Sequence, residues 1–137
     1  MHLPVEGVFH NLCFVSIDKR YPGHAFKVMH ALWGLGQMMF AKMIMVFDRN
    51  VNVQDLSEVL FFLGANVDAG RDLCVVKGPV DALDHAAFLP HLGHKMGLDC
   101  TRKWPEEGYS RPWPALVEMD KAVATKIDEI WDKLGLE

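Results

Sequence analysis

The sequence lacks the features that mark several large classes of protein. It has 14 basic and 18 acidic residues among 137 and a net charge of -4, so it offers no basic stripe that could neutralise a run of phosphates. No segment approaches the roughly 18 consecutive apolar residues of a membrane span, and the first residues lack the cationic and apolar regions of a signal peptide. We therefore expect neither a nucleic-acid partner nor a membrane span.

Cysteine is scarce, and no motif pairs it. Cys13, Cys74 and Cys100 form no Cys-x-x-Cys pair, and two of them lie inside apolar runs. A reduced thiol behaves there as a small hydrophobic group, which favours a reducing compartment. We expect a cytoplasmic protein, with peripheral attachment to a membrane as the alternative location.

The motifs of common catalytic and metal sites are also missing. There is no P-loop, no Ser-His-Asp order and no convincing carboxylate pair. Gly34 and Gly36 resemble the start of a dinucleotide fingerprint, but the third glycine is absent and the pair follows a predicted helix, so we interpret it as a helix terminator. His85, His91 and His94 fall in a predicted loop without the paired ligands of a structural zinc site, and we predict no metal site.

Half of the residues are hydrophobic, and short apolar runs alternate with segments of helical period. The runs predict buried strands at residues 12–17, 42–47 and 73–76. Amphipathic helices are predicted between them, one from His24 to Gly34 and one with Asn52 as N-cap that ends before Gly64. This alternation indicates an α/β fold of βαβ units with a small parallel sheet, or a mixed sheet with an antiparallel edge strand. We expect one domain over residues 1–137.

Two further segments follow the predicted strands. From Gly78 to about Pro114 the chain has prolines and turn residues but no convincing period, which predicts a long loop that covers a partner or a site. From Pro114, at a helical N1 position, to the end of the chain at 137, an apolar stripe predicts an amphipathic helix. That helix either packs on its own sheet or contacts another subunit. The candidate contact residues are Ile127, Ile130, Trp131 and Leu134.

Asp48 lies at the carboxyl end of the second predicted strand. Open parallel sheets place their ligands at such ends, but capping of the following loop explains an aspartate there equally well. By these rules alone, the sequence describes an α/β domain without an assigned function.

Six strings, in one order along the chain, add a family resemblance. They are LPVEG at 3–7, YPGHA at 21–25, DRNVNV at 48–53, LDHA at 83–86, LGHKMGLD at 92–99 and IDEIWD at 127–132, together with Thr101, Lys103, Trp104 and Pro105. This pattern resembles the carboxyl-terminal part of the UbiD decarboxylases, the 3-octaprenyl-4-hydroxybenzoate carboxy-lyase family of ubiquinone synthesis. One departure is His94, where relatives more often carry Ser or another small residue.

The resemblance implies part of a decarboxylase that uses prenylated FMN with a divalent metal, usually manganese. In that family a longer amino-terminal part holds the flavin phosphate, the metal and the catalytic residues, and none of those motifs is present in this sequence. We therefore expect no catalytic residue, no bound cofactor and no metal in this chain alone. The expected partners are the missing N-terminal flavin-binding domain and further copies of the protein in a homo-oligomer.

The resemblance also implies that this domain closes over the flavin from one side and carries subunit contacts through its terminal helix. Our candidates for the cleft rim are Leu35, Gly36, Gln37, Met38, Asp84 and His85. One alternative is a pure assembly module that contributes nothing to the active site. Another is an independent nucleotide or flavin binder that uses the strand ends, which the missing glycine-rich loop disfavours.

Overall fold

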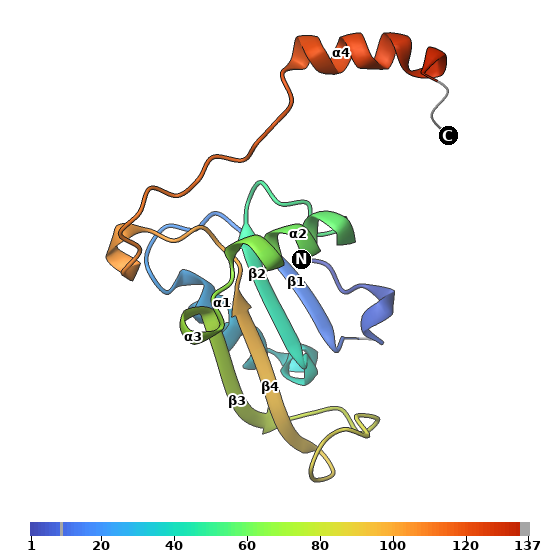
Figure 1. The fold of residues 1–137 in the computed structure, drawn as a ribbon. Helices are drawn as coiled ribbons and strands as arrows, with labels where there is room; N and C mark the ends of the chain where they lie inside the picture. Colours follow the sequence, from blue (N-terminus) through green and yellow to red (C-terminus); the bar gives the residue numbers. More distant parts are fainter. Residues whose placement is uncertain (9, 135–137) are drawn as a thin grey trace.

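The structure, a computed structural model, describes residues 1–8 and 10–134. It contains a four-stranded sheet with helices on both faces, followed by an extended arm that ends in a helix (Figure 1). The strands are β1 (Leu12–Ile17), β2 (Met43–Asp48), β3 (Leu73–Pro79) and β4 (Leu92–Asp99). The helices are α1 (His24–Trp33), α2 (Leu56–Asn66), α3 (Ala69–Asp72) and α4 (Lys121–Ile130), with short 3-10 turns η1 (Val5–Gly7), η2 (Gly36–Phe40), η3 (Pro105–Glu107) and η4 (Trp131–Lys133).

The sheet has the order β1-β2-β4-β3 and is mixed. β1, β2 and β4 run parallel, and β3 pairs antiparallel with β4 at one edge. Helix α1 connects β1 to its parallel neighbour β2. Parallel strands need such a crossover, because a tight hairpin turn can join only antiparallel strands. The predicted α/β class and the antiparallel edge strand are confirmed.

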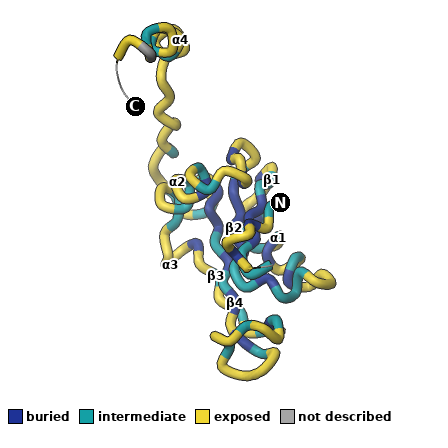
Figure 2. The backbone as a smooth tube through the Cα atoms, turned by 90° about the vertical axis from the view of Figure 1, so that its right-hand side faces the viewer, coloured by how far each residue is buried: buried dark blue, intermediate teal, exposed yellow. Residues whose placement is uncertain are grey.

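Alternation along β1 and β2 builds a core on each face of the sheet. Cys13, Val15, Ile44 and Val46 point to the face that α1 covers, where Met29 is fully buried. The intervening residues Phe14, Met45 and Phe47 point to the other face, where Val59 of α2 packs. Figure 2 shows this burial concentrated in the strands. Both faces of these strands are covered, and this explains why their sequences are continuous apolar runs.

Two boundaries differ from the prediction. The N-cap of α2 is Asp55, whose carboxylate accepts hydrogen bonds from the amides of Ser57 and Glu58, whereas Asn52 accepts a bond from Gln54 in the turn before the helix. An Asp ranks as high as an Asn at this position, so rank alone could not separate the two. The helix also continues through Gly64 to Asn66, because a glycine inside a helix lowers its stability without ending it.

The predicted long loop contains a strand of the sheet. β4 occupies Leu92–Asp99 and pairs with two neighbours, so the loop prediction was wrong over these residues. Gly93 and Gly97, and the polar residues His94 and Lys95, hid the strand pattern in the sequence. At Gly97, an added Cβ would lie 2.5 Å from the sulfur of Met29, so glycine lets α1 approach the sheet.

The terminal helix begins later than predicted. Residues 114–120 form neither a helix nor a strand, and α4 starts after Asp120, which caps it by accepting hydrogen bonds from the amides of Ala122 and Val123. Pro112 and Pro114 disfavour the helical conformation at the residues that precede them, Arg111 and Trp113. Figures 1 and 2 show the arm carrying α4 away from the sheet, with most of its residues exposed. Among the helices that the structure describes, none has the length and apolarity needed to cross a membrane.

Candidate functional site

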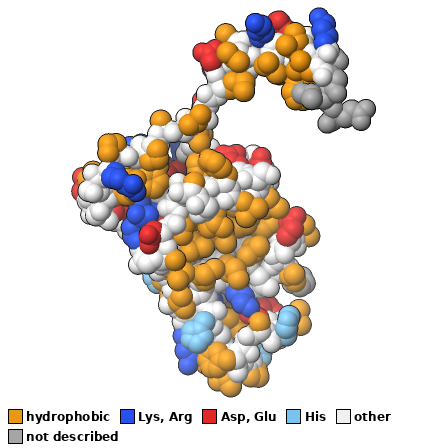
Figure 3. Space-filling model, in the orientation of Figure 1, with side chains coloured by type: hydrophobic (Ala, Val, Ile, Leu, Met, Phe, Trp, Pro, Cys, Tyr) orange, Lys and Arg blue, Asp and Glu red, His pale blue; other side chains and the backbone are white. Residues whose placement is uncertain are grey.

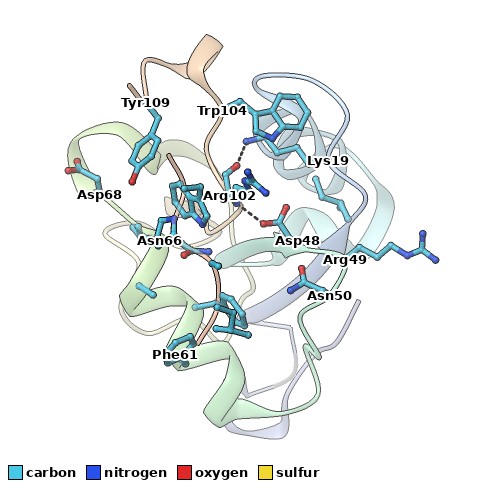
Figure 4. A pocket seen from close by; sticks show the side chains of 18 of the residues that line it. Lys19, Asp48, Arg49, Asn50, Phe61, Asn66, Asp68, Arg102, Trp104 and Tyr109 are labelled. Carbon is cyan, nitrogen blue, oxygen red and sulfur yellow. Dashed lines mark hydrogen bonds between the residues drawn. The ribbon is translucent and has the colours of Figure 1, made fainter. Parts of the chain in front are cut away.

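The carboxyl ends of β1, β2 and β4 open into a pocket of about 1160 Å³ (Figure 4). Its walls are the loops that follow these three strands, the last turns of α2, and the start of the arm. Parallel α/β sheets bind ligands at this end because the loops there diverge between the strands. The polar and aromatic wall residues include Lys19, Asp48, Arg49, Asn50, Asn66, Arg102, Trp104, Tyr109 and Trp113.

Asp48 lines the pocket, and its side chain caps a different loop from the following one that the sequence suggested. Its carboxylate Oδ2 accepts a hydrogen bond of 2.6 Å from the backbone amide of Arg102, and its side chain also lines the pocket. Burial raises the pKa of Asp48 above its ordinary value, although the Arg102 amide and the Lys19 ammonium oppose that rise. A carboxyl group at a strand end is therefore tied to the loop that follows β4.

Lys19, which follows β1, binds the loop that follows β4. Its Nζ donates to both carboxylate oxygens of Glu107, at 2.8 and 2.6 Å, and to the carbonyl of Arg102 at 2.8 Å. The ammonium also lies 5.2 Å from the ring centroid of Trp104, within cation–π range. The lysine is buried, so these partners replace its lost hydration.

A buried ionic network lies beneath the pocket wall. The Nζ of Lys103 lies 3.4 Å from Asp72 and 3.2 Å from Asp99, and all three residues are at most 3% exposed. Arg71 adds a two-pronged hydrogen bond to Asp72, at 2.9 and 2.7 Å. Burial alone would raise the pKa of Asp72, but the hydrogen bonds from Arg71 and the Asp68 amide and the Lys103 charge hold it below its ordinary value. The network joins α3 to the loop after β4.

The walls of the pocket combine cationic, acidic and aromatic side chains. No Ser, Cys or His lines it, so no hydroxyl or thiol stands beside an imidazole base there. Within residues 1–8 and 10–134, no carboxylate forms an ion pair with Arg49 or Arg102. These cations could hold a group with negative charge, and the aromatic walls could stack on a planar ring.

The residues of this chain do not fit the cofactors that the resemblance implies. The connection after β1 contains a single glycine, Gly23 at the N-cap of α1, and the turns 48–50 and 100–102 contain none, whereas a phosphate loop is rich in glycine. In the part of the chain that the structure describes, no group of three His, Cys, Asp or Glu side chains could hold a metal ion.

The predicted rim residues lie at the opposite end of the sheet, where β2 begins. Leu35, Gly36 and Gln37 are exposed in and beside η2, and Met38 packs against the α1-side core. Two buried side chains hold the carbonyls that follow: Lys95 Nζ donates to Met39 at 2.7 Å, and Trp33 Nε1 donates to Ala41 at 2.9 Å. None of the rim residues lines the strand-end pocket.

Asp84 and His85 belong to that same end. Asp84 accepts a 2.8 Å hydrogen bond from Lys42, the residue just before β2, and this bond lowers the pKa of Asp84 below its ordinary value. His85 is exposed, as are His91 and His94. His94 lies on β4 rather than in a loop, with its ring 5.2 Å from that of Phe88. The structure thus brings the two halves of the predicted rim to one end of the sheet, far from the pocket.

The predicted contact residues of the terminal helix have few partners. Ile127 and Ile130 are half-buried, whereas Trp131 and Leu134 are exposed. Within the described chain, no side-chain hydrogen bond or ion pair joins residues 121–134 to the sheet or its helices. Part of the apolar stripe is exposed to solvent.

Sequence reasoning missed most of the strand-end pocket. Its members come from three loops, one helix and the arm, which no single motif links. The available signal was the rule that parallel strands place ligands at their carboxyl ends, and it identified Asp48 alone. Arg102, Trp104 and Tyr109 follow β4, a strand that was not predicted.

Comparisons with known proteins agree on one family. The family model for the 3-octaprenyl-4-hydroxybenzoate carboxy-lyase C-terminal domain matches residues 1–100. An uncharacterised protein of Aquifex aeolicus is 60% identical over 136 residues, which is 99% of this chain and 28% of that protein. An uncharacterised protein of Archaeoglobus fulgidus is 48% identical over 98% of this chain and 28% of its own length. The chain thus spans little more than a quarter of these relatives.

Solved structures give the same result. The vanillic acid decarboxylase of Sedimentibacter hydroxybenzoicus in its closed form has a TM-score of 0.76 and 26% identity, over 89% of this chain and 26% of that one. The UbiD-class enzyme HmfF of Pelotomaculum thermopropionicum, in complex with FMN, has a TM-score of 0.68 and 28% identity, over 82% of this chain and 25% of that one.

Proposed function

The chain belongs to the 3-octaprenyl-4-hydroxybenzoate carboxy-lyase family, and from this premise we propose that it is the carboxyl-terminal part of a prenylated-FMN-dependent, non-oxidative decarboxylase of aromatic acids of the 4-hydroxybenzoate type. The observation that carries the proposal is the similarity, in sequence and fold, to the equivalent quarter of UbiD-class decarboxylases. We assign the remaining chemistry to a flavin-binding part that lies outside these residues.

The division of labour follows from what the described residues can hold. They offer neither a glycine-rich turn at the ends of the parallel strands nor a cluster of metal ligands. The flavin, when bound by the complete enzyme, supplies the electron sink for decarboxylation. This chain contributes shape, exclusion of water and subunit contacts, and we expect it to be inactive alone.

We assign the cleft-facing role to the end of the sheet where β2 begins. Exposed residues of η2 and the loop around Asp84 converge there, and Lys95 and Lys42 fix both segments to the sheet. A rigid base under exposed side chains is what positions groups within a catalytic cleft. The rim is then Leu35, Gly36, Gln37, Met38, Asp84 and His85.

The test replaces rim residues in a full-length protein, in which this chain substitutes for the equivalent part of the Aquifex aeolicus relative. Leu35→Ala and Gln37→Ala should lower kcat/KM by about tenfold or more, because misplacement of a bound substrate by a fraction of an ångström is costly. Release of carbon dioxide from a panel of aromatic acids gives the rates. Leu60→Ala is the matched control, since Leu35 and Leu60 are 62% and 63% exposed.

An assembly module with no role in the active site is the competing function. It requires unchanged kinetics in every rim variant, as long as light scattering shows the same oligomer. The exposed stripe of α4 supports an assembly role in addition to the cleft role, and we propose that α4 contacts a second subunit through Ile127, Ile130, Trp131 and Leu134.

The strand-end pocket favours a second candidate, a flavin or nucleotide site within this chain. Its cations and aromatic walls are compatible with such a ligand, although its turns are not rich in glycine. Titration of the isolated chain with FMN, followed by quenching of flavin fluorescence, decides between them. We expect no saturable binding, and tight binding that Arg102→Ala abolishes would move the cofactor to this pocket.

We also propose a cytoplasmic location. The three cysteines are all free, and burial raises the pKa of Cys13 to about 11 and that of Cys100 to about 12. Thiols in such surroundings are unreactive core groups rather than disulfide partners, which suits a reducing compartment.

A further inference from the structure

Arg102, in the wall of the strand-end pocket, has a fixed backbone and a side chain that is free to bind. Its amide donates a hydrogen bond of 2.6 Å to Asp48, and its carbonyl accepts one of 2.8 Å from Lys19. The residues on either side, Thr101 and Lys103, are at most 3% exposed. Within residues 1–8 and 10–134, the guanidinium of Arg102 makes no hydrogen bond or ion pair with another side chain. A guanidinium on a fixed base can bind an anion without first giving up another contact.

Aromatic side chains form two walls of the same pocket. Trp104 follows β4, and the ammonium of Lys19 lies 5.2 Å from its ring centroid. Tyr109 and Trp113 form the wall on the side of the arm, with their ring centroids 4.9 Å apart. Figure 4 shows Arg102, Trp104 and Tyr109 around one pocket. Flat aromatic faces of this kind favour a ligand with a planar ring.

The charges around the pocket favour a ligand with one negative charge. Five Lys and Arg residues line it, together with three aspartates that offset part of their charge. Two of the five cations are already paired, Lys19 with Glu107 and Arg71 with Asp72. Figure 3 shows Lys and Arg side chains on the side of the molecule where the arm leaves the body. One carboxylate therefore balances these walls better than the several charges of a nucleotide.

We propose that the strand-end pocket binds a planar aromatic monoanion, whose carboxylate lies on the guanidinium of Arg102 and whose ring lies between Trp104 and the pair of Tyr109 and Trp113. The pocket, at about 1160 Å³, has room for a fused aromatic ring. The inference does not depend on the proposed decarboxylase function, because none of the rim residues lines this pocket. It also differs from the flavin or nucleotide alternative, since it needs no phosphate loop.

The experiment measures binding of naphthoate to the 137-residue chain by isothermal titration calorimetry at low salt, beside two matched ligands. Naphthamide has the same ring without the charge, and decahydronaphthoate has the same charge without a planar ring. Naphthoate should bind saturably. Naphthamide should bind at least about tenfold more weakly, because it lacks the charge-assisted hydrogen bonds. Decahydronaphthoate should bind at least about threefold more weakly, because it cannot stack on the aromatic walls.

Two pairs of variants locate the site. Arg102→Gln should weaken naphthoate binding by about tenfold or more, whereas Lys77→Gln, which removes an exposed cation at the other end of the sheet, should leave it within about twofold. Trp113→Leu should weaken it by about threefold or more, whereas Trp131→Leu, beyond α4, should not. The thermal midpoint of Arg102→Gln should match that of the wild type, because the fixed backbone of Arg102 is unchanged.

Three results would overturn the inference: no saturable binding of naphthoate, equal affinity for naphthoate and naphthamide, or unchanged affinity in Arg102→Gln. The comparison of the two ligands needs no variant, so it remains decisive if Arg102→Gln does not fold. The same titrations in the full-length hybrid with the Aquifex aeolicus relative show whether the pocket is open there. A loss of affinity in its Arg102→Gln variant supports the inference. Equal binding by that hybrid and its variant would mean that another part of the longer protein fills the pocket, which also overturns it.

Discussion

The body of the protein and its arm differ in how far their apolar side chains are buried and their charged side chains are paired within the chain. In the body, over residues 1–108, apolar residues fill a core on each face of the sheet, and buried Lys19, Asp72, Asp99 and Lys103 have partners within the chain. In the arm, from Tyr109 onward, Val117 is 96% exposed and Trp131 is half exposed. The body is packed internally, whereas much of the arm is exposed.

This difference suits the body and the arm to different functions. A region whose charges and apolar groups are paired internally can present a rigid rim to a reaction. A region with an uncovered stripe gains free energy only on association, since isolated helices of this length are marginal in water. Substitutions of one kind, made in both regions, should therefore have unequal effects on stability.

We expect the largest difference in the free energy of unfolding when one lysine of the body and one lysine of the arm are each replaced by methionine. Lys103→Met removes the cation between Asp72 and Asp99 and should lower the free energy of unfolding by about 3–5 kcal/mol, because two buried carboxylates lose their partner. Lys121→Met, at the exposed start of α4, should change it by less than about 0.5 kcal/mol. Urea denaturation of both variants measures the difference. Equal effects would mean that the ionic network adds nothing to the stability of the body.

Replacement of a methionine by alanine should give the next largest difference in stability between the body and the arm. Met29 is fully buried against Gly97, and Met29→Ala should cost about 2–5 kcal/mol through the cavity it leaves. Met119 is 64% exposed in the arm, and Met119→Ala should be nearly neutral. Thermal unfolding of the two variants at one protein concentration checks this. A destabilising Met119→Ala would place the arm against the body in solution.

Two aspartates should give smaller effects of opposite sign in acid. The folded pKa of Asp72 lies below its ordinary value, so its stabilising contribution is complete above about pH 4 and is lost as the pH falls through that lower pKa. The folded pKa of Asp48 is raised, so its contribution becomes less favourable as the pH rises from the ordinary value to the folded one.

Unfolding measured from pH 3 to pH 7 tests both signs. Asp72→Asn should reduce stability most at the upper end of this range and least at the lower end. Asp48→Asn keeps an oxygen acceptor for the Arg102 amide, so it should be neutral or stabilising at pH 7. Parallel pH profiles for the wild type and Asp48→Asn would show that Asp48 titrates normally in the folded protein.

Continuous patterns in the sequence predicted the elements that they formed. The apolar runs of β1 and β2 and the helical stripe of α1 appear at nearly the predicted residues. β4 escaped prediction because its buried positions are Gly93, Lys95, Gly97 and Asp99, which no hydrophobic pattern detects. Tertiary contacts, such as the bond from Lys95 to Met39, make those residues suitable for a central strand.

The start of the terminal helix and the strand-end pocket could not be predicted from the sequence, for two other reasons. Pro114 has the residue type of a helix start, but the cap that operates is Asp120. The pocket combines Lys19, Asp48 and Arg102, which are up to 83 residues apart and meet only when β1, β2 and β4 pair. The predicted rim residues do meet at one end of the sheet, and their role in a cleft stays a prediction.

The most direct test of a self-sufficient body and a dependent arm compares the whole chain with a chain that ends at Gly108. Light scattering gives the mass of each over a dilution series, and thermal unfolding gives its midpoint. We predict that the whole chain is a dimer or larger oligomer, and that the shorter chain is a folded monomer that unfolds cooperatively. A whole chain that remains monomeric at every concentration, or a shorter chain that does not fold, would contradict the account.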